Sequence, residues 1–290
     1  MRDQALKYYF GIAATMGVLG LAGPAIASQA ANIIIPAHEA AAQMCKSLMS
    51  AQDRQPMSSD VITLKWTNAL GQLNRLTGPA LLKCSVRTGR VLKEIWAVNG
   101  NLHNPSGPAY REYDQITQNL RAEGWWLHGK QTRKDGPVFT IRDPLTQIVT
   151  TEEWRQNDVY FRDSGEATNL RRDSVTGIVI LEEWAEGQQG EDLHRVGAPA
   201  LVQRDPVSGI VVYEEWRQQD KFFRENDLPT RIWRHNVNGK VIREEWKTGY
   251  ILDRNSGPAV IQYLPDGSAI QETEYWLKGK KIQKIPQNVP

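Results

Sequence analysis

The sequence predicts an all-β protein: an elongated antiparallel meander of about seven hairpin repeats of ~30 residues each, preceded by one N-terminal helix. Three observations predict this fold: a recurring Glu-x-Trp motif, β-branched runs between turn-forming clusters, and a single stretch of strong helix formers. The motif occurs seven times. Its glutamates are Glu94, Glu123, Glu152, Glu182, Glu214, Glu244 and Glu274, and its tryptophans are Trp96, Trp125, Trp154, Trp184, Trp216, Trp246 and Trp276.

Successive tryptophans of the motif lie 29 to 32 residues apart. A fixed period of this length is typical of arrays in which each unit packs mainly on its neighbours. Trp66 lies 30 residues before Trp96 and opens a half-unit that lacks the glutamate. The array therefore covers residues 61–286, and residues 287–290 form a tail. We expect an open sheet, because the blades of a closed propeller need four strands and usually ~40 residues or more.

The first 27 residues are predicted to be a signal peptide. Arg2 and Lys7 give a positive start, residues 10–23 are apolar, and small residues at 25 and 27 form a cleavage site. The alternative is an uncleaved membrane anchor, although an apolar core of about 14 residues is short for a span of ~20. No later segment is long and apolar enough to span a bilayer. We therefore expect an exported protein, periplasmic or secreted.

Residues 28–60 are predicted to form an N-terminal helical cap. Pro36 and the helix formers that follow it predict a helix over residues 36–54, which would cover the exposed end of the array. The chain has only two cysteines, Cys45 in this helix and Cys84 in the first unit. In an oxidising compartment the pair is a disulfide candidate, and the alternative is two unrelated buried thiols.

Each unit is expected to begin with a turn such as Asp205–Gly209, in which a final glycine supplies a positive φ. A β-branched strand then leads into Glu-Glu-Trp, and a second turn such as Gln219-Asp220 leads into a short strand. The unit closes on Gly-Pro-Ala, as in Gly257–Ala259, or on a variant of it. Because proline cannot donate a ladder hydrogen bond, this step predicts a bend or bulge.

The alternation of side chains along a strand places each tryptophan and the glutamate two residues before it on one face. We expect the tryptophans, Trp66 included, to form a core row, because a buried indole removes ~150–250 Å² from water. The alternative is an exposed aromatic strip that binds sugars or peptides. A carboxylate in such a row needs donors, such as backbone N–H groups or an indole N–H, and this predicts a structural role for the glutamates.

The other face shows a second regularity. Wherever a glutamate directly precedes the tryptophan, an arginine follows the tryptophan by eight or eleven residues. A two-residue turn between them would place the two side chains opposite each other, so we expect cross-strand ion pairs on a solvated face. The expected pairs are Glu153 with Arg162, Glu183 with Arg195, Glu215 with Arg224, and Glu245 with Arg254.

The sequence carries no recognisable catalytic, cofactor or metal motif. The five histidines are scattered without metal-ligand spacing, and there is no phosphate-binding glycine loop and no Gly-x-Ser-x-Gly. Seven equivalent glutamates argue against an active site, which needs one special constellation. The 35 basic and 33 acidic side chains are interspersed, which argues against a nucleic-acid partner. We therefore expect no enzyme, no cofactor and no catalytic residue.

The order Glu-x-Trp, Asn-Gly, Leu-His and Gly-Pro-Ala resembles the MORN-like repeats, including those of the YwqK-type antitoxin family. Residues 96–109 and 184–200 carry the resemblance best, with Gly100 and His103 in the expected places. It implies a meander of hairpins and an interaction role, and it transfers no active site.

We therefore expect an exported, non-enzymatic repeat protein that presents an extended surface to a protein or envelope partner. One alternative is a glycan-binding module that uses exposed tryptophan and tyrosine side chains. A second alternative is a hydrolase with a site assembled across repeats. The sequence predicts neither the identity of the partner nor the oligomeric state.

Overall fold

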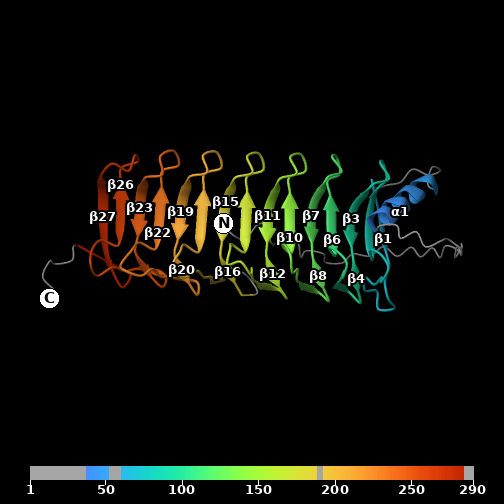
Figure 1. The fold of residues 1–290 in the computed structure, drawn as a ribbon, viewed down its shortest axis with the longest axis horizontal. Coiled ribbons are helices and arrows are strands. Elements are labelled where there is room, and N and C mark those ends of the chain that lie inside the picture. Colours follow the sequence, from blue (N-terminus) through green and yellow to red (C-terminus); the bar gives the residue numbers. More distant parts are fainter. Residues whose placement is uncertain (1–36, 52–59, 188–191, 284–290) are drawn as a thin grey trace. The chain divides into compact units, whose positions relative to one another are not determined.

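The computed structural model describes residues 37–51, 60–187 and 192–283 (Figure 1). The predicted signal peptide and the tail from residue 287 lie outside these residues. Within them, one α-helix precedes an all-β array, and the sheet strands follow one another in chain order. The strands of the main sheet are β1 (Val61–Lys65), β2 (Leu81–Ser85), β3 (Val91–Ile95), β6 (Tyr110–Tyr113), β7 (Leu120–Gly124), β10 (Phe139–Arg142), β11 (Val149–Glu153), β14 (Asn169–Arg172), β15 (Val179–Glu183), β18 (Leu201–Arg204), β19 (Val211–Glu215), β22 (Arg231–Arg234), β23 (Val241–Glu245), β26 (Val260–Tyr263), β27 (Ile270–Leu277) and β28 (Lys280–Ile282).

These 16 described strands form a single antiparallel sheet, with β1 at one end and β28 at the other. The prediction of an open meander of hairpin repeats is confirmed, and the sheet does not close into a ring. At ~4.8 Å between neighbouring strands, the row of strands extends over roughly 70 Å.

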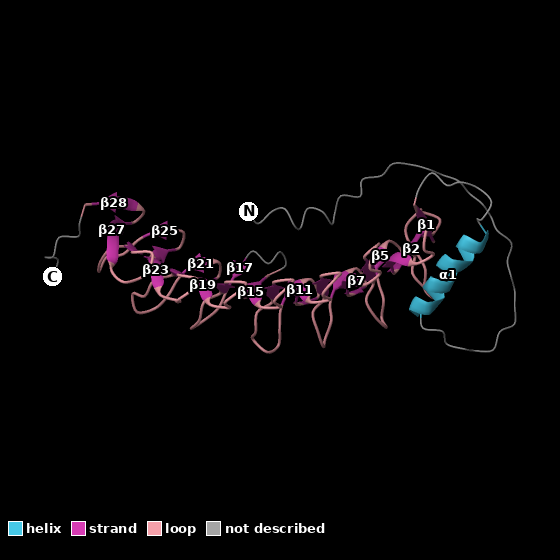
Figure 2. Ribbon diagram, turned by 90° about the horizontal axis from the view of Figure 1, so that it is seen from above, coloured by secondary structure: helices cyan, strands magenta, loops and turns pink. Residues whose placement is uncertain are grey.

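Each of the first six units also contributes a small two-stranded hairpin that lies outside the main sheet. A unit therefore holds four strands, because the chain leaves the main sheet at the tryptophan and forms a separate hairpin. Figure 2 shows these hairpins along one side of the array. They are β4–β5 (Ala97–Val98, Asn101–Leu102), β8–β9 (Trp126–Leu127, Lys130–Gln131), β12–β13 (Arg155–Gln156, Val159–Tyr160), β16–β17 (Ala185–Glu186, Asp192–Leu193), β20–β21 (Arg217–Gln218, Lys221–Phe222) and β24–β25 (Lys247–Thr248, Ile251–Leu252).

Both predicted turns are present. In the first, Gly209 has a φ of 72°, and the Asp205 carboxylate accepts the backbone N–H of Ser208 at 2.8 Å. In the second, Gln219 and Asp220 have φ values of 49° and 62°, the two positive values of a type I′ hairpin turn. Because φ is positive at both central residues, these small hairpins turn tightly and match the twist of their strands.

Hydrogen bonds between equivalent turns join neighbouring units. At one edge of the array, the Thr176 hydroxyl donates to the carbonyl of Pro206 in the next turn at 2.9 Å. At the other edge, the backbone N–H of Gln219 donates to Nδ1 of His194 in the preceding unit at 3.0 Å. Each unit is therefore held by its neighbours along both edges, as expected for a repeat array.

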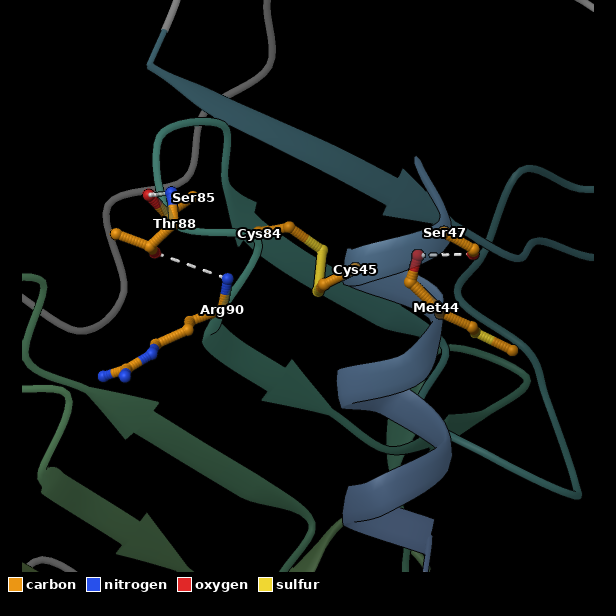
Figure 3. Close-up of a disulfide and its surroundings, with 7 residues drawn as sticks. All are labelled: Met44, Cys45, Ser47, Cys84, Ser85, Thr88 and Arg90. Carbon is orange, nitrogen blue, oxygen red and sulfur yellow. Dashed lines mark hydrogen bonds between the residues drawn. A yellow bond between two sulfur atoms is a disulfide. The ribbon is translucent and has the colours of Figure 1, made fainter. Parts of the chain in front are cut away.

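Helix α1 (Ala37–Ala51) packs on one face of β2 and β3. Cys45 and Cys84 are buried there and form a disulfide, with their Cα atoms 5.6 Å apart, so the predicted bond is confirmed (Figure 3). Leu82 completes the core of this contact, and Trp66 packs against it. The described helix thus covers the tryptophan face of the first strands, which differs from the expected position over the outer strand edge.

The seventh Glu-x-Trp motif is not equivalent to the other six. Glu274 pairs across the sheet with Val260, in the place that Glu245 takes opposite Arg231. β27 has one extra residue before the tryptophan. Thr273 therefore stands at the strand position that the motif glutamate holds in the other units. A shift of one residue moves every side chain to the other face of a strand. Trp276 consequently lies in the β27–β28 hairpin and not at the bend.

Candidate interaction surface

An arginine side chain lies over the indole ring of six tryptophans in the described part of the array. The guanidinium carbon is 3.6 to 4.1 Å from the ring centre, which is the geometry of a cation–π contact. The pairs are Arg75 on Trp66, Arg133 on Trp125, Arg162 on Trp154, Arg195 on Trp184, Arg224 on Trp216, and Arg254 on Trp246.

The same arginines explain the Gly-Pro-Ala step. Arg133 donates to the carbonyl of Pro137 at 3.1 Å, and the backbone N–H of Trp125 donates to the carbonyl of Val138 at 2.7 Å. A Cβ on Gly136 would lie 2.7 Å from the Arg133 guanidinium carbon. Glycine leaves this space to the guanidinium, although Ala198 takes the equivalent place beside Arg195, which lies 3.6 Å from the Trp184 ring centre. Each unit closes on itself through its own tryptophan, arginine and proline.

The unit that follows Trp96 has an asparagine in place of the arginine. Asn104 donates to the carbonyl of Pro108 at 3.0 Å and thus keeps the closing hydrogen bond without a stacked cation. A Cβ on Gly107 would lie 3.5 Å from the Asn104 amide nitrogen, an ordinary contact distance. This unit provides a natural control for the role of the arginine.

We expect Gly136→Ala to lower the free energy of unfolding by about 1 kcal/mol, because the new methyl group pushes the flexible Arg133 guanidinium aside on the Trp125 ring. Gly107→Ala, at the equivalent position of the unit without an arginine, should change it by less than about 1 kcal/mol. Denaturant unfolding of the two variants checks this. Equal stabilities would contradict the fit between glycine and guanidinium.

The predicted ion pairs between glutamates and these arginines are wrong. Arg162 contacts Glu166, and Arg254 pairs with Asp227 at 2.9 Å. The chain bends at each tryptophan into a separate small hairpin, so the register of the main sheet does not continue to the arginine. The arginine instead returns over the ring of its own tryptophan. Burial there lowers the pKa of the Arg224 guanidinium.

The motif glutamates share a face with the tryptophans and pair mainly with the following strand of the sheet. The Trp154 indole N–H donates to Glu152 at 3.4 Å, which is one of the donors that the sequence suggested. The arginine partners were not predicted, although Arg172, Arg204 and Arg234 directly precede the next first turn. These contacts are Arg172–Glu152 at 2.7 Å, Arg204–Glu182 at 3.0 Å, Arg234–Glu214 at 3.0 Å and Arg111–Glu94 at 3.7 Å.

The tryptophans do not form a fully buried row. Trp246 is 7% exposed, whereas the others of the motif and Trp66 are half-buried. Part of each ring is covered by an arginine, and small residues such as Ala109 and Ala200 fill the tightest space behind the bend. The tryptophans thus support the bends between units, with one ring edge accessible.

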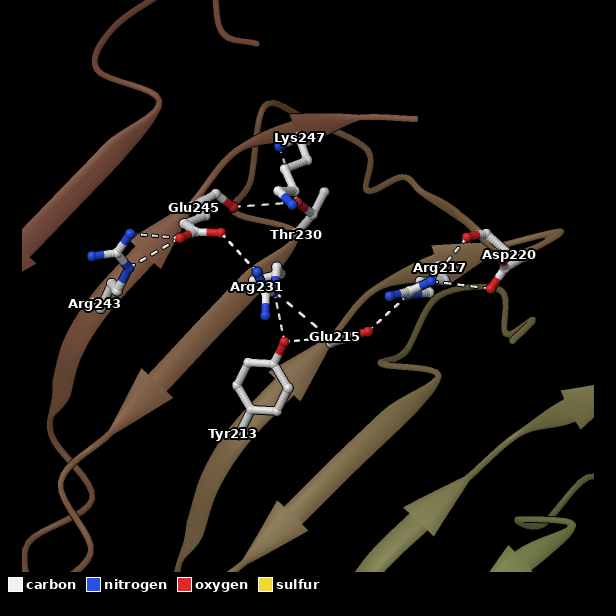
Figure 4. A network of polar contacts seen from close by, with 9 residues as sticks. All are labelled: Tyr213, Glu215, Arg217, Asp220, Thr230, Arg231, Arg243, Glu245 and Lys247. Atoms are coloured by element: carbon white, nitrogen blue, oxygen red, sulfur yellow. Dashed lines mark hydrogen bonds and ion pairs between the residues drawn. The ribbon is translucent and has the colours of Figure 1, made fainter. Parts of the chain in front are cut away.

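The opposite face is not the solvated face that the sequence predicted. Glu215 and Glu245 are each 6% exposed. Arg231 lies between them, with Nη1 3.1 Å from Glu245 and Nε 3.6 Å from Glu215 (Figure 4). The Tyr213 hydroxyl also bonds Glu215, and Arg217 adds a contact to the same carboxylate at 2.7 Å. Buried carboxylates require such partners, and they find them on neighbouring strands.

Glu153 occupies the equivalent position in an earlier unit and has fewer partners. Arg155 lies 3.6 Å from it, and burial raises the pKa of the Glu153 carboxyl. A carboxyl group whose pKa is higher in the folded than in the unfolded state lowers the free energy of unfolding once the pH rises above its unfolded-state pKa. Its charge is therefore a cost at neutral pH.

We expect Glu153→Gln to stabilise the protein at pH 7, and this gain should vanish below about pH 4, where the carboxyl is protonated in both states. Glu274→Gln is the matched control. Hydrogen bonds from Lys281 and Trp276 lower the pKa of Glu274, so its loss should destabilise at pH 7 and have little effect in acid. Unfolding both variants at the two pH values checks this. A Glu153→Gln variant that is less stable than wild type at pH 7 contradicts it.

A shallow hollow of about 350 Å³ lies beside this polar network. The residues that line it are Arg231, Glu245, Lys247, Tyr250, Ile251, Leu252, Trp276 and Gly279. Burial, followed by the nearby Arg231 charge, lowers the pKa of the Lys247 amine. Among the described residues, no carboxylate lies within ion-pair distance of Lys247. The Lys247 amine instead lies 4.8 Å from the Phe222 ring centre, and the hollow combines this amine with the Glu245 carboxylate and with apolar and aromatic walls.

The described residues contain no cluster of three or more histidine, cysteine, aspartate or glutamate side chains placed to hold a metal ion. No helix among them has both the length and the apolar character needed to cross a membrane. Comparison of the chain with protein-family models, with curated proteins and with solved structures found no match.

Proposed function

We propose that this is an exported, non-enzymatic repeat protein that presents an extended surface to a protein or envelope partner. The repeated tryptophans, arginines and glutamates bond to one another within the array, which supports a structural role for the motif. The disulfide supports export, because such bonds persist in oxidising compartments. The resemblance to MORN-like repeats stays a prediction and supports the same kind of role.

The hollow beside Lys247 is the observation that carries this proposal. The half-buried Lys247 amine makes no direct ion pair among the described residues, and a carboxylate from a partner would supply one. Arginine, tyrosine and tryptophan are also the residues that contribute most to protein–protein contacts. The hollow lies in the last units, where the residues that line it differ from those of earlier repeats. We expect the residues that select a partner to lie where a repeat departs from the common pattern.

Capture of envelope proteins on the immobilised full chain tests this proposal. Lys247→Glu should abolish capture, because it replaces the free cation by a charge that repels an acidic partner. Lys221→Glu makes the same charge change at an exposed site on the preceding small hairpin and should retain capture. Equal capture by both variants, or none by the wild type, contradicts the assignment.

The glycan-binding alternative makes a different use of the same hollow, since Trp276 and Tyr250 could stack on a sugar ring. Trp276 lacks the stacked arginine that covers six other tryptophans, so more of its ring is available. Titration with neutral oligosaccharides would then quench tryptophan fluorescence in the wild type and not in Trp276→Ala. Absence of any sugar-dependent change favours the protein partner.

A further inference from the structure

One edge of the array carries a row of exposed aliphatic side chains with no role in the fold. They occupy the third position of the first turn in five successive units. We name these side chains the tip row; they are Ile116 (92% exposed), Leu145 (79%), Val175 (78%), Val207 (82%) and Val237 (73%). Single exposed aliphatic residues are common, but their repetition at one structural position in five units indicates a shared contact.

The turns hold the tip row firmly in place. In the turn of Val175, the Asp173 carboxylate accepts the N–H groups of Val175 and Thr176 at 3.0 and 2.7 Å. The Thr176 hydroxyl then bonds the following turn, as the Thr146 hydroxyl bonds the carbonyl of Ser174 at 2.9 Å. The aliphatic side chains therefore stand on a continuous rim of hydrogen-bonded turns. Binding would cost little further conformational entropy, because the turns are already ordered.

The residues directly beside each tip are uncharged. Each tip lies between proline, serine, threonine, asparagine or glutamine residues. Where the turn begins with an aspartate, the carboxylate is bonded to its own turn, and those backbone hydrogen bonds lower its pKa, as at Asp143, Asp173 and Asp205. These carboxylates remain charged but are held within their own turns, so the tips themselves offer a partner apolar side chains.

The spacing of the tips restricts the partner further. Successive tips are two strands apart, or ~9.6 Å, and five tips extend over ~38 Å. A helix with an apolar residue every seven positions repeats at ~10.5 Å and would lose alignment along the row. The tip row of a second copy of this chain has the same spacing, because the two copies are identical. Because Val175 is the middle member, a two-fold axis through it sets Ile116 against Val237 and Leu145 against Val207.

We propose that the tip row is a contact surface between two copies of this chain, packed antiparallel about Val175. A two-fold contact uses the same residues on both copies, as a self-complementary row does. Five separated side chains on each copy bury less than the ~1,200 Å² of a standard stable interface. The dimer is therefore reversible and forms as the protein concentration rises. The hollow beside Lys247 is not part of this contact, so the proposal does not depend on the proposed function.

Sedimentation of the full chain over a range of concentrations tests the dimer. Val175→Asp sets two carboxylates against each other at the axis and should raise the dissociation constant about tenfold or more. Val196→Asp is the control, because Val196 is 69% exposed but lies at a Gly-Pro-Ala bend on the other edge. It should leave the dimer unchanged, and unaltered melting of both variants excludes misfolding as the cause.

Cysteine cross-linking tests the geometry directly. Both native cysteines are in the disulfide, so Val175→Cys carries the one free thiol of the chain. Oxidation should link two copies of Val175→Cys, and a mixture of Leu145→Cys with Val207→Cys should form the mixed dimer. Val196→Cys should not link. A wild type that stays monomeric at every concentration overturns the proposal. A dimer insensitive to Val175→Asp, or a monomer that binds neutral lipid vesicles through the tips, also overturns it.

Discussion

Trp246→Ala should lower the free energy of unfolding by about 3–5 kcal/mol, the usual cost of removing a large buried ring. Trp246 is the most buried tryptophan of the motif, at 7% exposure. Its indole N–H donates to the carbonyl of Asp227 at 2.8 Å, and Arg254 lies 3.8 Å from the ring centre. The substitution therefore leaves a cavity, an unpaired carbonyl and an unsupported guanidinium at one bend.

Trp276→Ala is the matched control, because Trp276 lies outside the bend and its nearest cation, Lys281, is 6.0 Å from the ring centre. It should cost less than about 2 kcal/mol. Hydrogen exchange should show faster opening of β23 and β26 in Trp246→Ala, since each unit stabilises its neighbours. A Trp276→Ala variant that is the less stable of the two contradicts the assignment of Trp246 to the structural bend.

The period, the turns and the open sheet were predictable because their signals are local. A glycine after Asp-Pro-Val-Ser fixes a positive φ wherever it occurs, and Gly209 adopts it. Strand propensity and a constant tryptophan spacing then define the hairpins without reference to distant residues. The disulfide was predictable for a different reason, since Cys45 and Cys84 had no other cysteine to pair with.

The arginine contacts were not predictable from strand register. The prediction extended the ladder of the main sheet past the tryptophan, but the chain bends there and β12–β13 forms its own sheet. The closing geometry shows that the arginine bonds the carbonyl of the proline in the closing step, as Arg133 does with Pro137.

The burial of Glu215 and Glu245 was also missed. A glutamate beside a tryptophan on a single-layered sheet was expected to face solvent. The small hairpins instead place Phe222 and Arg217 close to this face, with the Arg217 guanidinium carbon 4.1 Å from the Phe222 ring centre. Strand alternation identifies the two faces of a sheet, but it does not identify which later segment covers one of them.

Loss of the Cys45–Cys84 disulfide should lower the free energy of unfolding by about 4 kcal/mol on the chain-entropy model, given a sequence separation of 39 residues. Unfolding in denaturant with and without a thiol reductant measures this loss. The double variant Cys45→Ala, Cys84→Ala is the control. Its stability should be independent of the reductant and close to that of the reduced wild type.

The effect should be confined to one end of the array. Helix α1 contacts β2 and β3, and Cys45 and Cys84 belong to the core that these elements share with Leu82 and Val91. In a repeat array each unit senses only its neighbours, so reduction should speed hydrogen exchange in β2 and β3 and leave β23 and β26 protected. Uniform acceleration along all units would instead mean that the array opens as one cooperative body. In that case the helix contact would stabilise every repeat, because one end then sets the stability of the whole sheet.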